Sequence, residues 1–145
     1  MRNSSKNEND INPIDYADQH GITVYYGEIP LCESMSVCKG ETCYIAIDPL
    51  CIRSMADGRV KAAHEVGHCE TGSFYARSSP ADVRGRHEYR ADKWAVHYLI
   101  PPDKLQEALN DGYTDTWELA EQFDVTEEFV QRAVYIYQCE GLLSA

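Results

Sequence analysis

The pattern His64-Glu65-x-x-His68 constrains this chain more than any other feature of its sequence. On an α-helix, residues four apart lie on the same face, so the two imidazoles can bind one metal ion without bending the backbone. Glu65 lies about 100° around the same helix, since one turn takes ~3.6 residues. From there its carboxylate can reach a water bound to that metal. This arrangement is typical of a zinc hydrolase with Glu65 as the catalytic base.

The same residues could instead form a solvated helix face, because His and Glu are common on exposed helices. The neighbouring residues favour a buried helix, in which two histidines need partners. These neighbours are small or apolar: Val60, Ala62, Ala63, Val66 and Gly67.

A second acidic motif, Glu88-Tyr-Arg-Ala-Asp92, follows within a short distance. Catalytic zinc sites usually take three protein ligands, and His, His and Glu is one standard set, so we predict that Glu88 is the third ligand. Asp92 comes four residues later and points the same way from a second helix. We expect it to accept the free ring N–H of His64 and to fix that ring's orientation. The alternative is an exposed charged turn in which Arg90 pairs with an acid.

Together the two motifs resemble the ImmA/IrrE family of small bacterial and phage metallopeptidases. The resemblance covers residues 14–138 and is carried by Ala63-His64-Glu65-Val-Gly-His68 and by Glu88-Tyr-Arg-Ala91-Asp92-Lys-Trp-Ala95-Val-His-Tyr-Leu99-Ile-Pro101. It implies a zincin-like fold, Zn²⁺ as the cofactor, His64, His68 and Glu88 as its ligands, and Glu65 as the base. It also implies a regulatory role, namely cleavage of a helix-turn-helix transcriptional repressor in a mobile element, a phage or a stress response.

One segment departs from that family. After His68 the chain reads Cys69-Glu70-Thr71-Gly72, where many members carry further His and apolar residues. The difference concerns contacts with the substrate and leaves the metal-binding set as it is.

Length and charge narrow the classes of protein that fit. With 145 residues and 43% hydrophobic content, we expect residues 1–145 to form one domain. No apolar run approaches the ~18 residues of a membrane helix, and the polar N-terminus has no apolar centre of a secretory signal, so we expect a cytoplasmic protein. A net charge of −11 disfavours direct contact with nucleic acid and favours a basic polypeptide partner.

The order of elements predicts an α+β fold, in which a small three-stranded mixed sheet packs on the His64–His68 helix and a helical bundle follows. Residues 1–11 are expected to be disordered. Helices are expected at 13–20, 55–69, 86–100, 102–109, 114–123 and 126–137, and strands at 22–26, 31–37 and 42–48. We expect Tyr44–Ile47 near the sheet centre and a long loop over 73–86. One strand between residues 31 and 48 is expected to hold an extended substrate.

Residues 114–138 read as a helix-turn-helix, which could indicate a DNA-reading module. Its acidic side chains oppose a single base, Arg132, whereas phosphate contact needs Lys and Arg. The acids are Asp115, Glu118, Glu121, Asp124, Glu127 and Glu128. We therefore interpret this region as a structural bundle or as a docking surface for a protein.

Several assignments stay open at this point. The oxyanion donor could be Tyr75, His87, His97 or Tyr98. Cys32, Cys38, Cys43 and Cys51 contain no close pair, which favours free thiols over a structural metal or a redox switch. A non-catalytic zincin-fold protein that binds a repressor or a toxin is the alternative to the peptidase.

Overall fold

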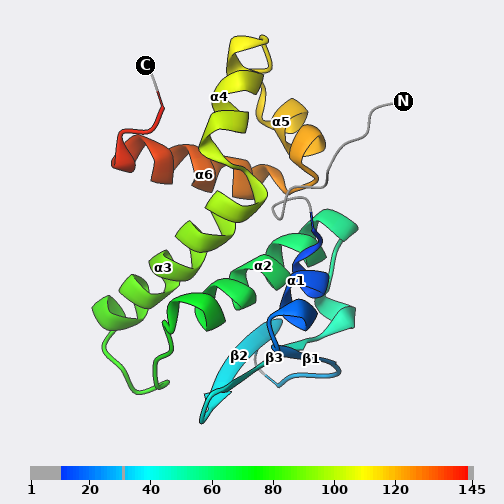
Figure 1. Ribbon diagram of the computed structural model, residues 1–145, viewed down its shortest axis with the longest axis vertical. Helices are drawn as coiled ribbons and strands as arrows, with labels where there is room; N and C mark the ends of the chain where they lie inside the picture. Colours follow the sequence, from blue (N-terminus) through cyan, green and yellow to red (C-terminus); the bar gives the residue numbers. More distant parts are fainter. Residues whose placement is uncertain (1–10, 31, 144–145) are drawn as a thin grey trace.

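The computed structural model describes residues 11–30 and 32–143, and its elements are shown in Figure 1. In chain order they are α1 (Pro13–Gln19), β1 (Thr23–Tyr26), β2 (Ser34–Lys39), β3 (Thr42–Ile47), the short 3-10 helix η2 (Pro49–Cys51), α2 (Met55–Thr71), α3 (Ala81–Leu99), α4 (Pro102–Asn110), α5 (Thr116–Phe123) and α6 (Glu127–Glu140). The expected α+β fold is confirmed. The predicted disorder of residues 1–11 falls outside the described residues, apart from Ile11.

The three strands form one mixed sheet in the order β1-β3-β2. β3 lies in the centre, as the apolar run at Tyr44–Ile47 predicted. It is parallel to β1 and antiparallel to β2. Alternate residues of β3, Ile45 and Ile47, are fully buried against the helices. β2 begins at Ser34, later than expected, and it leaves one edge of the sheet open beside α2.

α2 carries the His64-Glu65-x-x-His68 motif through the middle of the molecule (Figure 1). It starts where the sequence indicated, because the Ser54 side chain accepts a hydrogen bond from the Asp57 amide at 3.0 Å. It ends at Thr71, two residues later than predicted. There Gly72 takes up the left-handed conformation at φ 64°, which closes the helix without a Cβ clash.

Two apolar cores contact different sides of α2. The core on the sheet side comprises Ala17, Ile22, Ile45, Ile47, Ala62 and Val66. The core on the helical side joins Ala63 of α2 to buried residues of α3, α4, α5 and α6. Because Ala62 and Ala63 face different cores, α2 is covered on both sides and the metal motif is fixed in a rigid frame.

α3 corrects the sequence prediction, because it begins at Ala81 and not at Arg86. Pro80 precedes the first turn and Asp82 lies within it, both of which favour a helix start. Gly85 lies inside this helix, and it costs a helix only about 1 kcal/mol. The loop between the two motif helices is therefore shorter than expected.

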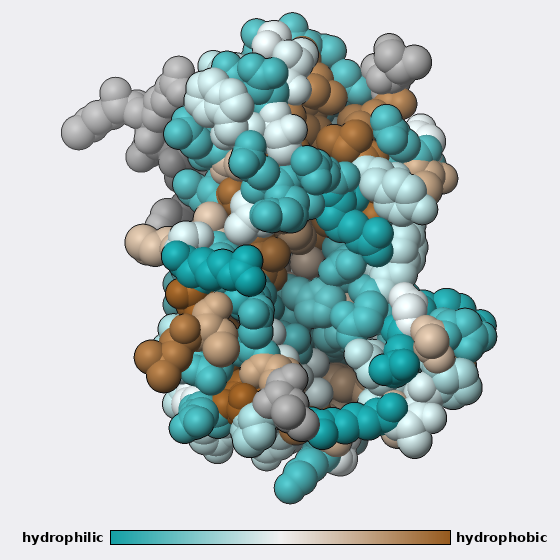
Figure 2. All heavy atoms as spheres, turned by 180° about the vertical axis from the view of Figure 1, so that it is seen from behind, coloured by the Kyte–Doolittle hydropathy of each residue, from teal (hydrophilic) through white to brown (hydrophobic). Residues whose placement is uncertain are grey.

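The C-terminal bundle of α4, α5 and α6 follows the prediction closely. α6 is capped by Thr126, whose hydroxyl accepts a hydrogen bond from the Phe129 amide at 3.2 Å. α5 starts at Thr116 and not at Thr114. Seen from behind, the molecule is largely hydrophilic, with apolar patches near the top, over these helices, and lower down, over the sheet (Figure 2). Within the described residues, no helix combines the length and the apolar character needed to cross a membrane.

Candidate metal centre

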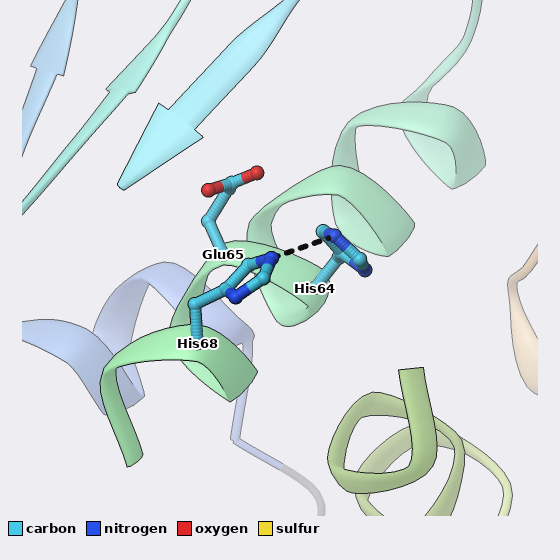
Figure 3. A group of neighbouring side chains, drawn as sticks. All are labelled: His64, Glu65 and His68. Atoms are coloured by element: carbon cyan, nitrogen blue, oxygen red, sulfur yellow. Dashed lines mark hydrogen bonds between the residues drawn. The ribbon is translucent and has the colours of Figure 1, made fainter. Parts of the chain in front are cut away.

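His64 and His68 lie one turn apart on α2, and their Nε2 atoms face each other at 3.2 Å (Figure 3). The Nδ1 atom of His64 is 2.7 Å from Asp92 Oδ1, and the Nδ1 atom of His68 is 2.6 Å from the Ser73 carbonyl oxygen. Both partners are acceptors, so each ring carries a proton on Nδ1. The two Nε2 atoms are therefore the ones left to bind a cation.

Glu88, on α3, brings its carboxylate to the same point. Its Oε2 lies 2.8 Å from His64 Nε2 and its Oε1 lies 3.2 Å from His68 Nε2. In a tetrahedral zinc site with bonds of ~2.0–2.1 Å, neighbouring ligand atoms are about 3.3 Å apart. The three side chains are therefore spaced as zinc ligands are, and their chemistry fits that ion.

Glu65 lies beside this group but points toward the sheet (Figure 3). Its ligand atoms lie within 4.8 Å of those of His64 and His68. Oε1 accepts a hydrogen bond from the Ser34 hydroxyl of β2 at 3.3 Å, and Oε2 is buried without a partner in the described part of the chain. The two carboxylates thus differ, since Glu88 contacts both imidazoles and Glu65 keeps one oxygen unpaired.

The charges around the imidazoles favour a cation. Burial lowers the pKa of His64, but hydrogen bonds to Asp92 and Glu88 outweigh it and raise that pKa to about 10. Burial raises the pKa of Glu88, yet contacts with His64 and His68 hold it well below its usual value. The same acidic partners, Asp92 and Glu88, would also stabilise a divalent metal ion that replaced the proton on His64 Nε2.

Two supporting contacts were absent from the sequence prediction. Arg132 of α6 places its Nε 3.1 Å from Asp92 Oδ2, across a separation of 40 residues that no local pattern reveals. Gly67 lies against α3 so closely that an added Cβ would be 2.5 Å from the Ala91 carbonyl oxygen. The sequence did hint at this close approach, because both residues are small and each lies inside its motif.

The four oxyanion candidates are placed very differently. The Tyr75 hydroxyl donates to Glu88 Oε1 at 2.6 Å, and His87 stacks on the Tyr75 ring at 6.0 Å. His97 contacts Glu140 at 3.0 Å, and the Tyr98 hydroxyl donates to the carbonyl of Ile11. Only Tyr75 and its neighbour His87 therefore lie beside the candidate metal centre.

A cleft of about 500 Å³ runs between β2 and the side chains of His68 and Glu88. Its walls come from β2, α2, α3 and the loop after Gly72. They comprise Cys32, Ser34, Met35, Ser36, Val37, Cys38, Glu65, His68, Ser73, Phe74, Tyr75, Arg77 and Glu88. The sequence did not indicate which strand between residues 31 and 48 would lie at an open edge beside α2. In the structure that strand is β2.

The cysteines are not among these candidate ligands, although Cys32 and Cys38 line the cleft beside them. All six are free thiols. Cys69 turns toward Cys43 of β3, and burial followed by that contact raises the pKa of its thiol far above the usual range. Within residues 11–30 and 32–143, the group of side chains that could hold a metal ion comprises His64, Glu65 and His68 and contains no cysteine.

Comparisons with known proteins agree with the geometry. A family model, Peptidase M78, described as the IrrE N-terminal-like domain, matches residues 17–135 and so spans both motifs. Neither a curated protein nor a solved structure matches the chain.

Proposed function

Since the chain belongs to the Peptidase M78 family of IrrE N-terminal-like domains, we propose that it is a zinc-dependent metallo-endopeptidase. In this proposal His64, His68 and Glu88 hold the zinc ion, Asp92 orients His64, and Glu65 is the catalytic base. The supporting observation is the convergence of both Nε2 atoms and the Glu88 carboxylate within 3.2 Å of one another. Family membership makes a polypeptide the substrate.

Glu65 has the surroundings that a general base needs. A bound zinc ion would supply Lewis acidity, which makes water acidic near neutral pH and polarises a peptide carbonyl. Glu65 Oε2 is buried and has no hydrogen-bond partner among the described residues, so it could take the proton of the attacking water and pass it to the departing amide nitrogen. The Ser34 hydroxyl holds the other oxygen and fixes the direction of the carboxylate.

The substrate would lie along β2 as an additional extended strand. Its main chain would pair with the open edge, while its side chains enter the cleft toward Phe74 and Tyr75. The Tyr75 hydroxyl is the favoured oxyanion donor, because it already lies within hydrogen-bond distance of Glu88.

The substrate we propose is a helix-turn-helix repressor of a mobile element or a stress response, met in the cytoplasm. The charge of the chain supports this choice. A net charge of −11 attracts a basic polypeptide and repels the phosphate backbone of nucleic acid.

Replacing Glu65 with Gln tests the proposal. The variant should bind zinc and melt like the parent, yet cleave its helix-turn-helix repressor substrate about 10²–10⁴-fold more slowly, the range typical of a lost general base. Cleavage is followed by gel after co-expression and with purified proteins. Glu70→Gln is the matched control, since Glu70 is exposed one turn further along α2 and should leave cleavage unchanged.

The alternative is a zincin-fold protein that binds a regulator without cutting it, with a structural metal. A structural zinc site usually closes all four positions with protein ligands. The nearest sulphur in the chain sequence, that of Cys69, turns toward Cys43 instead. If Glu65→Gln controlled the repressor in the cell as well as the parent does, the binding role would replace the peptidase.

A further inference from the structure

Arg132 connects the C-terminal bundle to the candidate metal centre. Its Nε lies 3.1 Å from Asp92 Oδ2, while Asp92 Oδ1 lies 2.7 Å from His64 Nδ1. One carboxylate thus joins a guanidinium on α6 to an imidazole on α2. Each of its oxygens has a separate partner.

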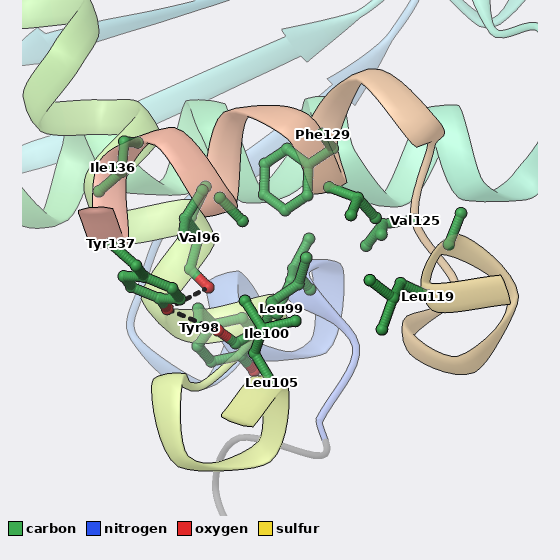
Figure 4. Packing of buried hydrophobic residues seen from close by; sticks show 14 of the residues in the cluster. Val96, Tyr98, Leu99, Ile100, Leu105, Leu119, Val125, Phe129, Ile136 and Tyr137 are labelled. Atoms are coloured by element: carbon green, nitrogen blue, oxygen red, sulfur yellow. Dashed lines mark hydrogen bonds between the residues drawn. The ribbon is translucent and has the colours of Figure 1, made fainter. Parts of the chain in front are cut away.

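The position of the guanidinium is fixed on both sides. It lies over the Tyr89 ring of α3 at 5.5 Å and over the Tyr135 ring of α6 at 5.6 Å, as cation–π pairs do. α6 itself is anchored to α3, because Tyr137 donates its hydroxyl to the carbonyls of Val96 and Ile100 (Figure 4).

Arg132 is also isolated among acids. It is the sole Lys or Arg between residues 116 and 140, a stretch whose acids are Glu118, Glu121, Asp124, Glu127, Glu128 and Glu140. The one basic side chain of this stretch contacts Asp92, so the contact pairs an isolated cation with the carboxylate that holds His64.

We propose that Arg132 is a positioning residue for the metal centre, acting through Asp92 on His64. A carboxylate held by one partner can rotate about its Cβ–Cγ bond, whereas Arg132 and His64 together fix the Asp92 plane. The His64 ring then presents Nε2 toward His68 and Glu88. This inference rests on the metal site proposed above and adds α6 to the parts of the fold that set metal affinity.

The sign of the change in zinc affinity distinguishes a positioning role of Arg132 from a purely electrostatic effect of its charge. Arg132 is positive, so by electrostatics alone its removal would strengthen the binding of a divalent cation. Loss of a positioning contact weakens binding instead. Arg132→Gln should therefore bind Zn²⁺ several-fold more weakly than the parent, a smaller loss than the ~10–100-fold expected for Asp92→Asn, which removes the direct partner of His64.

The experiment measures Zn²⁺ affinity at pH 7 by competition with a chromophoric chelator, and it uses a double-mutant cycle. If Arg132 acts through Asp92, Arg132→Gln should cause no further loss in the Asp92→Asn background. Arg90→Gln is the matched control, because it removes the same charge from an exposed position on α3 and should leave zinc affinity unchanged.

The outcomes distinguish this inference from the proposed function. If the parent protein bound no zinc, the metal site itself would be wrong. If the parent bound zinc and Arg132→Gln bound it equally or more tightly, or if the loss persisted in the Asp92→Asn background, the positioning role would be overturned. Melting of the metal-free proteins shows whether Arg132→Gln folds. Should it not fold, Arg132→Lys, which keeps the charge and loses the planar fork, takes its place with the same expected direction.

Discussion

The two faces of α2 are packed in different ways. Toward α3 the contact is between backbones, with Gly67 directly against the Ala91 carbonyl. Toward the sheet it is between side chains, with Ala62 and Val66 against Ile45. A backbone contact has no side chain that can adjust, whereas a side-chain contact can repack. The proposed zinc ligands come from α2 and α3, the two helices in backbone contact. The cleft opens on the side of α2 that faces the sheet.

Gly67→Ala should have the largest effect, because it places a methyl group between the backbones of α2 and α3. The added methyl would lie 2.5 Å from the Ala91 oxygen, so α2 and α3 must move apart. We expect a loss of about 1–3 kcal/mol in the free energy of unfolding, together with loss of zinc binding, since Glu88 moves away from both imidazoles. Urea unfolding and metal competition measure the two effects.

Gly85→Ala is the control for that change. Gly85 lies within α3, and a Cβ there would meet nothing within 4 Å. It should stabilise the helix by roughly 0.5–1 kcal/mol and leave zinc affinity alone. If Gly67→Ala behaved like Gly85→Ala, the contrast between the two faces of α2 would be wrong.

An effect on stability alone, without loss of zinc binding, is expected from Asp57, which tethers the sheet side to the first turn of α2. Its Oδ2 accepts from the Arg53 amide at 3.0 Å and from Lys61 at 2.6 Å, and Lys61 also holds Glu33 and the Cys51 carbonyl. Burial raises the pKa of Asp57, but these donors outweigh it and hold the pKa below its usual value. Its contribution to stability is thus present above the unfolded pKa of ~3.9 and is lost as pH falls through the lower folded value.

Asp57→Asn should therefore lower the free energy of unfolding by about 1–3 kcal/mol at pH 7 and flatten its fall below pH 4. Urea unfolding of the metal-free protein between pH 3 and 7 measures both. Asp82→Asn is the comparison, since Asp82 is exposed and contacts only Arg86, at 3.8 Å, among the described pairs. An equal change in both variants would show that the Asp57 tether is no stronger than a surface pair.

Cys69→Ala should have the smallest effect, because it removes one half-buried sulphur from the side of α2 that packs on the sheet. The neighbouring Cys43 can move into the space, so we expect a loss of about 1 kcal/mol or less. Zinc content, measured by atomic absorption, should stay at the parental value per chain. A fall in zinc content would make Cys69 a ligand and would contradict the assignment of the metal centre.

Local patterns predicted much of this structure. The starts of α2 and α6, the central place of β3 and the helical spacing of His64 and His68 all depend on residues close together in sequence. Such signals are readable because hydrogen-bonded caps and helical faces repeat over three or four residues.

Contacts between distant segments were not predictable in the same way. The pairing of Arg132 with Asp92, and the choice of β2 as the strand beside Glu65, depend on how helices and sheet dock. The start of α3 was misplaced for a related reason, since packing further along the helix outweighs the intrinsic cost of Gly85. The sequence therefore predicted that His64, His68, Glu88 and Asp92 converge, including the contact of Asp92 with His64, but it did not reveal Arg132 behind Asp92.

The location of α2 between two cores has a consequence for how the protein unfolds. Ala62 belongs to one core and Ala63 to the other, so disorder in either half of the molecule removes one of the supports of the same helix. A bound ion would then escape whichever half opened first. Metal release would serve as a single reporter for both unfolding routes, and a tightly held ion would slow proteolysis at sites far from its own ligands.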